Sequence, residues 1–236
     1  MSTCPHYPLR HDVQPPPKFM ENLAIDKRGF PVPWFVDWIN GEPEFRAMDM
    51  RKFRLAINRR LCWTCGNKLR DDEEVFVIGP MCAVNRISSE PPSHRECARY
   101  AALNCPFLSK PHMHRREDET FNTAKKPAAG IMVERNPGAT LLWFTRRHNL
   151  INSPARPGIA NPGILFQIGK PFATEWYANG RTATRAEVMA SIESALPLLR
   201  ETAEKHDGPQ GSMILEMHIT QAMRLVPKGS ARLSTG

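Results

Sequence analysis

Long apolar runs are missing from this chain of 236 residues. None approaches the roughly 18 consecutive apolar residues that a membrane-spanning helix needs, so we expect no membrane partner. An apolar stretch is also missing at the N-terminus, where a secretory signal would place one. Because disulfides form mainly in secreted proteins, we expect the six cysteines to stay reduced, and the sequence favours a cytoplasmic protein.

Familiar catalytic signatures are missing too. The sequence has no glycine-rich phosphate-binding loop, no nucleophile elbow and no acidic pair in a catalytic pattern. Hydrophobic residues make up 41% of the chain and charged residues 24%, which describes a globular protein with a modest core. These absences favour a binding protein over an enzyme.

Two short pairs of soft metal ligands are the most informative pattern. Cys62 and Cys65 form a C-x2-C pair, and after 28 intervening residues His94 and Cys97 form an H-x2-C pair. A tetrahedral zinc ion takes four such donors, and a short pair lets one turn of backbone supply two of them. Gly66 permits the sharp turn that points both thiolates the same way. The motif predicts one structural Zn2+ ion.

Other interpretations of these cysteines stay open. Cys82 or Cys105 could replace His94 as the fourth ligand. A C-x2-C pair also serves as a redox motif, but it then precedes a helix, and residues 68–74 do not have a helical pattern. The cysteines could also pack as small buried hydrophobic side chains without any metal.

The residues between the two pairs predict a β-hairpin. Residues 75–78 are β-branched and aromatic, and a Gly-Pro turn follows at 79–80. Residues 81–84 would then return as the second strand.

The second ligand pair is expected on a helix. Ser93-x-x-Glu96 is a capping box, which predicts a helix that begins at Ser93 and carries His94 and Cys97 on one face. A cysteine knuckle, a hairpin and a ligand-bearing helix, in this order over residues 61–105, resemble the treble-clef zinc finger. The stretch is also similar to a group of uncharacterised bacterial and phage zinc-binding proteins. Treble clefs serve nucleases, ribosomal proteins and structural modules, so the resemblance implies a fold and a metal rather than an activity.

A hairpin and a helix are expected before the knuckle. Residues 34–39 and 45–48 are strand candidates joined by the turn signal Asn40-Gly41. Two tryptophans in the first strand could stack on bases or pack over the zinc module. Asp49 should cap a helix that runs through Arg60, with Phe53, Ile57 and Leu61 on its buried side.

This helix begins the most basic stretch of the chain, whose formal net charge is +8. Between residues 51 and 70 there are seven basic residues and no acidic one, and acidic residues follow at 71–74. The basic residues are Arg51, Lys52, Arg54, Arg59, Arg60, Lys68 and Arg70. A basic helix beside a zinc knuckle predicts contact with nucleic acid phosphates. The alternative is a solvated face neutralised by the acidic run.

A second unit is expected after a polar linker. Strands are predicted over 131–135, 140–145 and 164–168, a helical turn over 174–177, and helices that begin at Thr184 and Ser212, with a kink at Pro197. Strands followed by helices indicate a small antiparallel sheet covered by helices, so the fold class is α+β. Arg146-Arg147-His148 beside Trp143 is a basic and aromatic patch whose residues could bind a ligand or only solvate a strand end.

The expected division of the chain follows from these patterns and from its 22 prolines, which indicate long irregular connections. It comprises an extended proline-rich arm (1–33), the zinc module (34–108), a linker (109–129), the α+β unit (130–226) and a flexible tail (227–236).

The favoured function is that of a zinc-stabilised protein that binds nucleic acid. The alternative is a protein-interaction factor that docks on a larger host or viral complex. A zinc-dependent nuclease or hydrolase is the third hypothesis, based on His112 and His114, but no histidine lies between residues 68 and 85, where such nucleases carry theirs.

Overall fold

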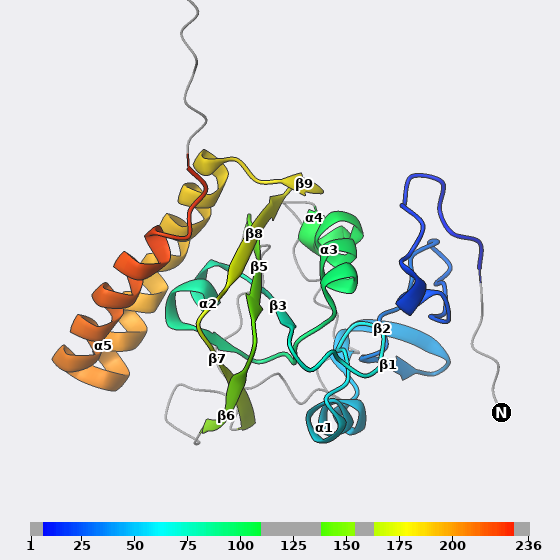
Figure 1. The fold of residues 1–236 in the computed structure, drawn as a ribbon, viewed down its shortest axis with the longest axis horizontal. Coiled ribbons are helices and arrows are strands. Elements are labelled where there is room, and N and C mark those ends of the chain that lie inside the picture. The colour runs from blue at the N-terminus through cyan, green and yellow to red at the C-terminus, as the bar shows by residue number, and fades with distance from the viewer. Residues whose placement is uncertain (1–6, 110–137, 154–162, 229–236) are drawn as a thin grey trace, which may run out of the picture.

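The computed structural model describes residues 7–109, 138–153 and 163–228 (Figure 1). Its helices are η1 (Lys18–Met20), α1 (Met50–Arg59), α2 (Pro80–Asn85), α3 (Arg95–Asn104), α4 (Pro106–Ser109) and α5 (Arg185–Met223). Its strands are β1 (Val36–Ile39), β2 (Glu42–Met48), β3 (Glu74–Ile78), β4 (Ile87–Ser88), β5 (Thr140–Thr145), β6 (His148–Ser153), β7 (Gly163–Ile168), β8 (Ala173–Ala178) and β9 (Arg181–Thr182). Helices combined with antiparallel strands make the fold α+β, as predicted.

The described strands form three antiparallel sheets. β1 and β2 make the predicted hairpin, and the larger sheets have the orders β3-β5-β8-β9 and β4-β7-β6. Strands β3 and β4 precede residues 110–137, whereas their neighbours β5 and β7 follow them. The sequence before the expected linker and the sequence after it therefore both contribute strands to each of the larger sheets.

The β3-β5-β8-β9 sheet is covered on both faces, and β5 shows this most clearly. Leu142 and Phe144 pack with Ala98 and Ala102 of α3 on one face. Leu141 and Trp143 belong to the main core on the other face, which includes Val188 and Ile192 of α5. Figure 1 shows the sheet between α3 and α5. Alternate residues of a strand point to opposite faces, so all six residues of β5 are buried.

Helix α5 is a helical hairpin. It opens with the predicted capping box of Thr184 and Glu187. Its non-helical residue is Gly208 (φ 63°, ψ −160°), where the chain reverses, and Arg200 and Glu216 form an ion pair of 2.7 Å across the two arms. The expected last helix is the second arm, and it begins just after Gly208, ahead of the expected start at Ser212. Pro197, where a kink was expected, lies inside the first arm.

Two further predictions of local structure are wrong. Residues 81–84 belong to helix α2, which begins with Pro80, and proline suits the first position of a helix because its nitrogen needs no partner there. The predicted β-hairpin is therefore absent, and β3 pairs with β5. Residues 174–177 belong to strand β8, where β5 supplies the backbone partners that a short sequence window cannot show. The treble-clef resemblance is thus limited to the knuckle and the ligand-bearing helix.

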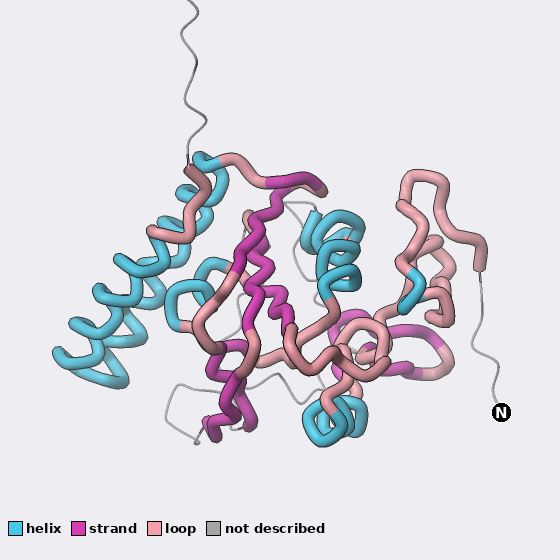
Figure 2. Tube along the Cα trace, in the orientation of Figure 1, coloured by secondary structure: helices cyan, strands magenta, loops and turns pink. Residues whose placement is uncertain are grey.

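The N-terminal arm has few regular elements in its described part (Figure 2), yet it packs on the body of the protein. Val13, Met20 and Leu23 share a buried cluster with three of the cysteines of the predicted zinc site. The described part of the arm thus contributes apolar residues to the core around those cysteines. Cys4 and His6 lie outside the described residues, as do His112, His114 and the strand expected over 131–135.

Among the described helices, none has the length and apolar character to span a bilayer.

The burial of β5 can be tested by comparing a buried and an exposed leucine. Leu142 is 0% exposed and Leu150, on strand β6, is 47% exposed. Replacing Leu142 with alanine should lower the free energy of unfolding by about 2–5 kcal/mol, because it leaves a cavity between the sheet and α3. The same change at Leu150 should shift it by no more than about 0.5 kcal/mol. Urea unfolding measures both, and equal losses would contradict this arrangement.

Candidate metal centre

The first ligand pair lies on a tight knuckle between α1 and β3. The Cys62 amide donates to Asn67 O (2.7 Å), and the Gly66 amide donates to Cys62 O (2.8 Å). Gly66 has a φ of +77°, and a β-carbon there would lie 2.7 Å from the Trp34 ring. Glycine is required for both reasons. Trp34 therefore packs on the knuckle. This agrees with the interpretation that the tryptophans pack over the zinc module.

The second pair lies at the start of α3. His94 is the N-cap residue, with extended backbone, and Cys97 lies in the first turn. The predicted helix start at Ser93 is wrong, because Ser93 exchanges backbone hydrogen bonds with Val75 of β3. Its hydroxyl lies 2.9 Å from the hydroxyl of Thr64 in the knuckle. Ser93 thus connects α3, the sheet and the knuckle.

The structure brings all four predicted ligands together. Their donor atoms, from Cys62, Cys65, His94 and Cys97, lie within 4.8 Å of one another, and all four residues are buried. His94 Nδ1 is 3.4 Å from the Cys65 sulfur and 3.9 Å from the Cys97 sulfur. The His94 amide also donates to the Cys62 sulfur (3.3 Å). Such a compact, buried set of sulfur and nitrogen donors is suited to a metal ion.

The orientation of the His94 ring fits this role. Its Nε2 lies 2.9 Å from Lys68 O, which can only accept a hydrogen bond. Nε2 therefore carries a proton, and Nδ1 is the ring nitrogen that faces the sulfurs and can bind an ion. A ligating histidine is held in this way when its second nitrogen donates to a backbone carbonyl.

Electrostatics of the four groups favour a cation between them. Burial opposes ionisation of Cys62, but hydrogen bonds from Cys65, Cys97 and His94 outweigh it and hold the pKa of Cys62 well below its usual value. Burial would lower the pKa of His94, yet its contacts with the Cys62 and Cys65 sulfurs raise that pKa to about 10. The contacts with Cys62 and Cys65 raise the pKa of Cys97. A buried thiolate thus needs a positive partner, and a divalent ion supplies one while leaving His94 neutral.

Neither alternative ligand belongs to this group. The set of donors close enough to share an ion contains neither Cys82 nor Cys105 in the described part of the chain. Cys82 lies on α2 and packs against the main core, where burial raises its pKa to about 11. Burial also raises the pKa of Cys105.

The N-terminal arm covers the site, a contact that no sequence pattern predicted. The Phe19 ring stacks on the His94 ring with centroids 4.4 Å apart. The side-chain amide of Asn67 donates to Phe19 O (3.0 Å) and lies 3.5 Å from the Cys65 sulfur. Tyr100 of α3 donates to Gln14 O (3.0 Å). The arm is thus held in place by the His94 ring, by Asn67 of the knuckle and by Tyr100 of α3.

The seven basic residues near the knuckle fall into two groups. Arg51 pairs with Asp49, Arg60 with Asp71 and Glu74, and Arg70 with Glu96. Lys52 donates to Val36 O (3.0 Å). The second group comprises Arg54, Arg59 and Lys68, which are exposed and whose side chains have no hydrogen-bond or ion-pair partner among the described residues.

Comparison of the chain with protein-family models, with curated proteins and with solved structures gave no match. Arguments about function therefore start from the geometry of the chain itself.

Metal content provides the first test of the centre. The protein purified without chelator should contain about one equivalent of divalent metal per chain, and Cys65→Ser should lose most of it, because three ligands hold an ion far less tightly than four. Cys82→Ser is the matched control and should retain the full equivalent. Elemental analysis measures all three. A metal-free wild type, or equal metal content in Cys65→Ser, would refute the centre.

Chelation should release the arm. Removing the ion loosens the His94 ring and the knuckle on which Phe19 and Asn67 pack, so we expect tryptic cleavage after Lys18 to accelerate by about tenfold or more. Cleavage after Lys205, on α5 at the opposite side of the sheet from α3, is the internal control and should change little. Mass spectrometry of timed digests follows both sites. Equal acceleration at the two sites would mean global unfolding instead.

Proposed function

We propose that this protein is a zinc-stabilised nucleic acid-binding protein, in which the ion orders a knuckle whose exposed cations contact phosphates. The proposal has two parts, the identity of the ion and the identity of the ligand.

Zinc is the ion that best suits the donor set. Three thiolates and one imidazole are a common ligand set of structural zinc sites, and harder ions such as Mg2+ and Ca2+ prefer oxygen ligands. Zinc bonds of about 2.3 Å to sulfur and about 2.0 Å to nitrogen at tetrahedral angles imply donor separations of about 3.5 Å for nitrogen to sulfur. The His94 separations of 3.4 and 3.9 Å are close to this value. Four protein ligands leave no open position for catalysis, which favours a structural ion over a nuclease.

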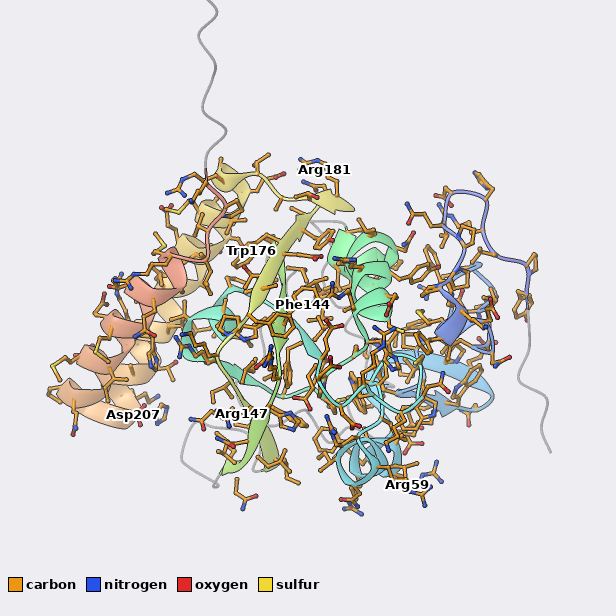
Figure 3. The ribbon with its side chains drawn as sticks, viewed as in Figure 1. Arg59, Phe144, Arg147, Trp176, Arg181 and Asp207 are labelled. Atoms are coloured by element: carbon orange, nitrogen blue, oxygen red, sulfur yellow. The ribbon has the colours of Figure 1, made fainter. Side chains whose placement is uncertain are left out.

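The single observation that supports nucleic acid binding is the set of exposed cations around this centre. Arg54 and Arg59 lie on α1, which leads directly into the knuckle, and Lys68 lies between the two ligand pairs. Figure 3 shows Arg59 extending outward at the edge of the molecule. The Lys68 carbonyl accepts from the ligand His94, so the centre also fixes the backbone of this cation. Cations without carboxylate partners are available to neutralise phosphates.

Exposed apolar side chains support a second candidate, protein docking. On the second arm of α5, Met213 is 67% exposed, Met217 56% and Ile214 39%. Neighbouring exposed methionines are typical of surfaces that adapt to a partner protein.

A salt titration tests the first candidate. Fluorescence anisotropy with labelled single-stranded and double-stranded oligonucleotides should show an affinity that falls steeply with salt concentration. Arg54→Gln and Arg59→Gln should each weaken binding and reduce the slope of log K against log salt by roughly 0.7–0.9, the value for one lost phosphate contact.

Lys205→Gln is the control, since Lys205 is an exposed helical cation two residues from Asp207, which lies on the opposite side of the molecule from Arg59 (Figure 3). It should leave both affinity and slope unchanged. Absence of binding to every oligonucleotide, or equal effects of Lys205→Gln and Arg59→Gln, would contradict nucleic acid binding and leave protein docking as the better account.

A further inference from the structure

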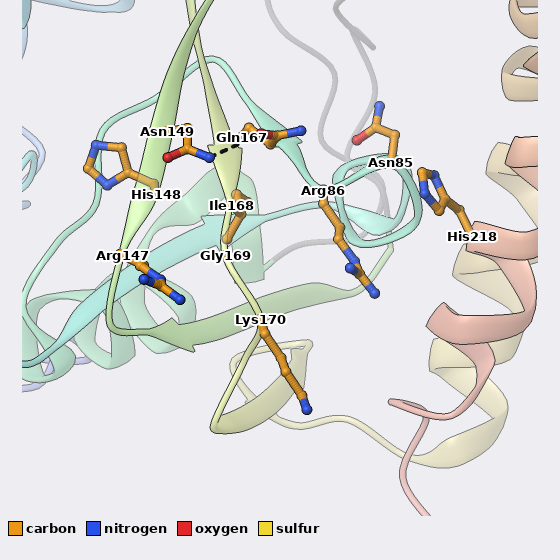
Figure 4. A pocket seen from close by; sticks show the side chains of 10 residues that line it. All are labelled: Asn85, Arg86, Arg147, His148, Asn149, Gln167, Ile168, Gly169, Lys170 and His218. Carbon is orange, nitrogen blue, oxygen red and sulfur yellow. Dashed lines mark hydrogen bonds between the residues drawn. The ribbon is translucent and has the colours of Figure 1, made fainter.

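A cavity of about 510 Å³ lies away from the metal centre, between the β4-β7-β6 sheet and α5. Its lining comes from the end of α2, the β5–β6 turn, the end of β7 and the second arm of α5 (Figure 4). The residues are Asn85, Arg86, Arg147, His148, Asn149, Gln167, Ile168, Gly169, Lys170 and His218. A cavity of this volume can hold a ligand the size of a nucleotide.

Positive charge dominates the cavity. Arg86, Arg147 and Lys170 line it, and none of its described lining residues is a carboxylate. Figure 4 shows these three side chains extending to the same side. The side chains of Arg147 and Lys170 are exposed and have no hydrogen-bond or ion-pair partner within the described ranges. Three like charges in one cavity repel one another unless an anion joins them.

The two histidines of the cavity, His148 and His218, differ in their surroundings. His218 of α5 lies beside Arg86 and Asn85 in Figure 4. Burial lowers the pKa of His218, and the positive charge of Arg86 lowers it further. The His148 ring turns away from the three cations, and its Nδ1 lies 2.8 Å from Glu74 Oε2. His148 is thus part of the wall.

Backbone hydrogen bonds fix the segments that carry the three cations relative to one another. The Ile168 amide donates to Arg86 O (2.8 Å), and the Gly169 amide donates to Arg147 O (3.2 Å). The buried Thr145 hydroxyl lies 3.1 Å from both Arg147 O and Lys170 O. The end of β7 therefore joins the segments that carry Arg86, Arg147 and Lys170. Such a rigid backbone sets the geometry of a site before its ligand arrives.

Gly169 makes this close approach possible. A β-carbon at position 169 would lie 2.9 Å from Thr145 Oγ1 and closer still to Arg147 O. The indole of Trp143 also donates to Gly169 O (2.9 Å). No side chain fits here, so the three segments meet only because the residue is glycine.

We propose that this cavity binds the phosphate groups of a ligand the size of a nucleotide, with Arg86, Arg147 and Lys170 as the phosphate-binding residues. Phosphate groups carry the charge that three fixed cations require, and arginine binds their oxygens through paired N–H groups. The side-chain amides of Asn85, Asn149 and Gln167 also line the cavity. Asn149 donates to Gln167 (3.3 Å), and the remaining amide groups can bond the rest of the ligand. This site goes beyond the nucleic acid surface around α1 and does not depend on it.

Isothermal titration calorimetry of the metal-bound protein with pyrophosphate tests the proposal. Wild type should bind saturably, and Arg147→Gln and Lys170→Gln should each weaken binding by about tenfold or more, because each removes a charge-assisted contact. Both residues are exposed, so the variants should keep the stability of the wild type, which thermal unfolding checks. Arg146→Gln is the matched control. Arg146 precedes Arg147 in the same turn and does not line the cavity, so its replacement should change affinity by less than about twofold.

Two further probes identify the source of the phosphate. A nucleoside triphosphate that binds more tightly than pyrophosphate indicates a free nucleotide. An oligonucleotide that competes with pyrophosphate only when it carries a 5′-phosphate indicates the end of a nucleic acid. Absence of saturable pyrophosphate binding to the wild type up to about 1 mM would overturn the proposal. Equal weakening by Arg146→Gln and Arg147→Gln would overturn it too, because it would show attraction by net charge alone.

Discussion

The structure around the knuckle depends on the mutual approach of three thiols and one imidazole in a buried space. Without an ion, these groups would have to share protons and charge away from water, which is costly. With an ion, Cys62 and Cys65 on the knuckle and His94 and Cys97 at the start of α3 become one unit. The arm over residues 7–33 then packs on this unit through Phe19. Binding of one ion would therefore order segments that have few regular elements of their own.

The metal unit is continuous with the rest of the molecule. Val75 of β3 exchanges backbone hydrogen bonds with Ser93, next to the ligand His94, and Arg95 of α3 pairs with Glu73 just before β3. β3 in turn pairs with β5 along its whole length, and β5 carries the core that faces α5. Loss of the ion should therefore affect the arm and knuckle first and the sheet through β3. The proposed phosphate site shares the same frame, since Glu74 of β3 holds His148 at its wall.

Features governed by neighbours in sequence could be predicted, and those governed by distant partners could not. The spacing within each ligand pair, the Asn40-Gly41 turn, the Asp49 cap and the Thr184 capping box all depend on contacts within a few residues, and the structure has them. Helix α2 and strand β8 were missed because the outcome depends on β5, which lies far away in the chain and pairs with both β3 and β8. Ser93 and Glu96 match a capping box, but the backbone of Ser93 is already engaged by β3. The phosphate cavity combines four segments, and of its lining residues only Arg147 and His148 stood out in the sequence, as part of the Arg146-Arg147-His148 patch.

The central claim is that one zinc ion bound by three sulfurs and one nitrogen organises the knuckle, α3 and the arm. X-ray absorption spectroscopy at the zinc edge of the purified protein tests it most directly. The account predicts a first shell of three sulfurs at about 2.3 Å and one nitrogen at about 2.0 Å. A shell made of oxygen and nitrogen, or a zinc signal that survives unchanged in Cys65→Ser, would contradict it.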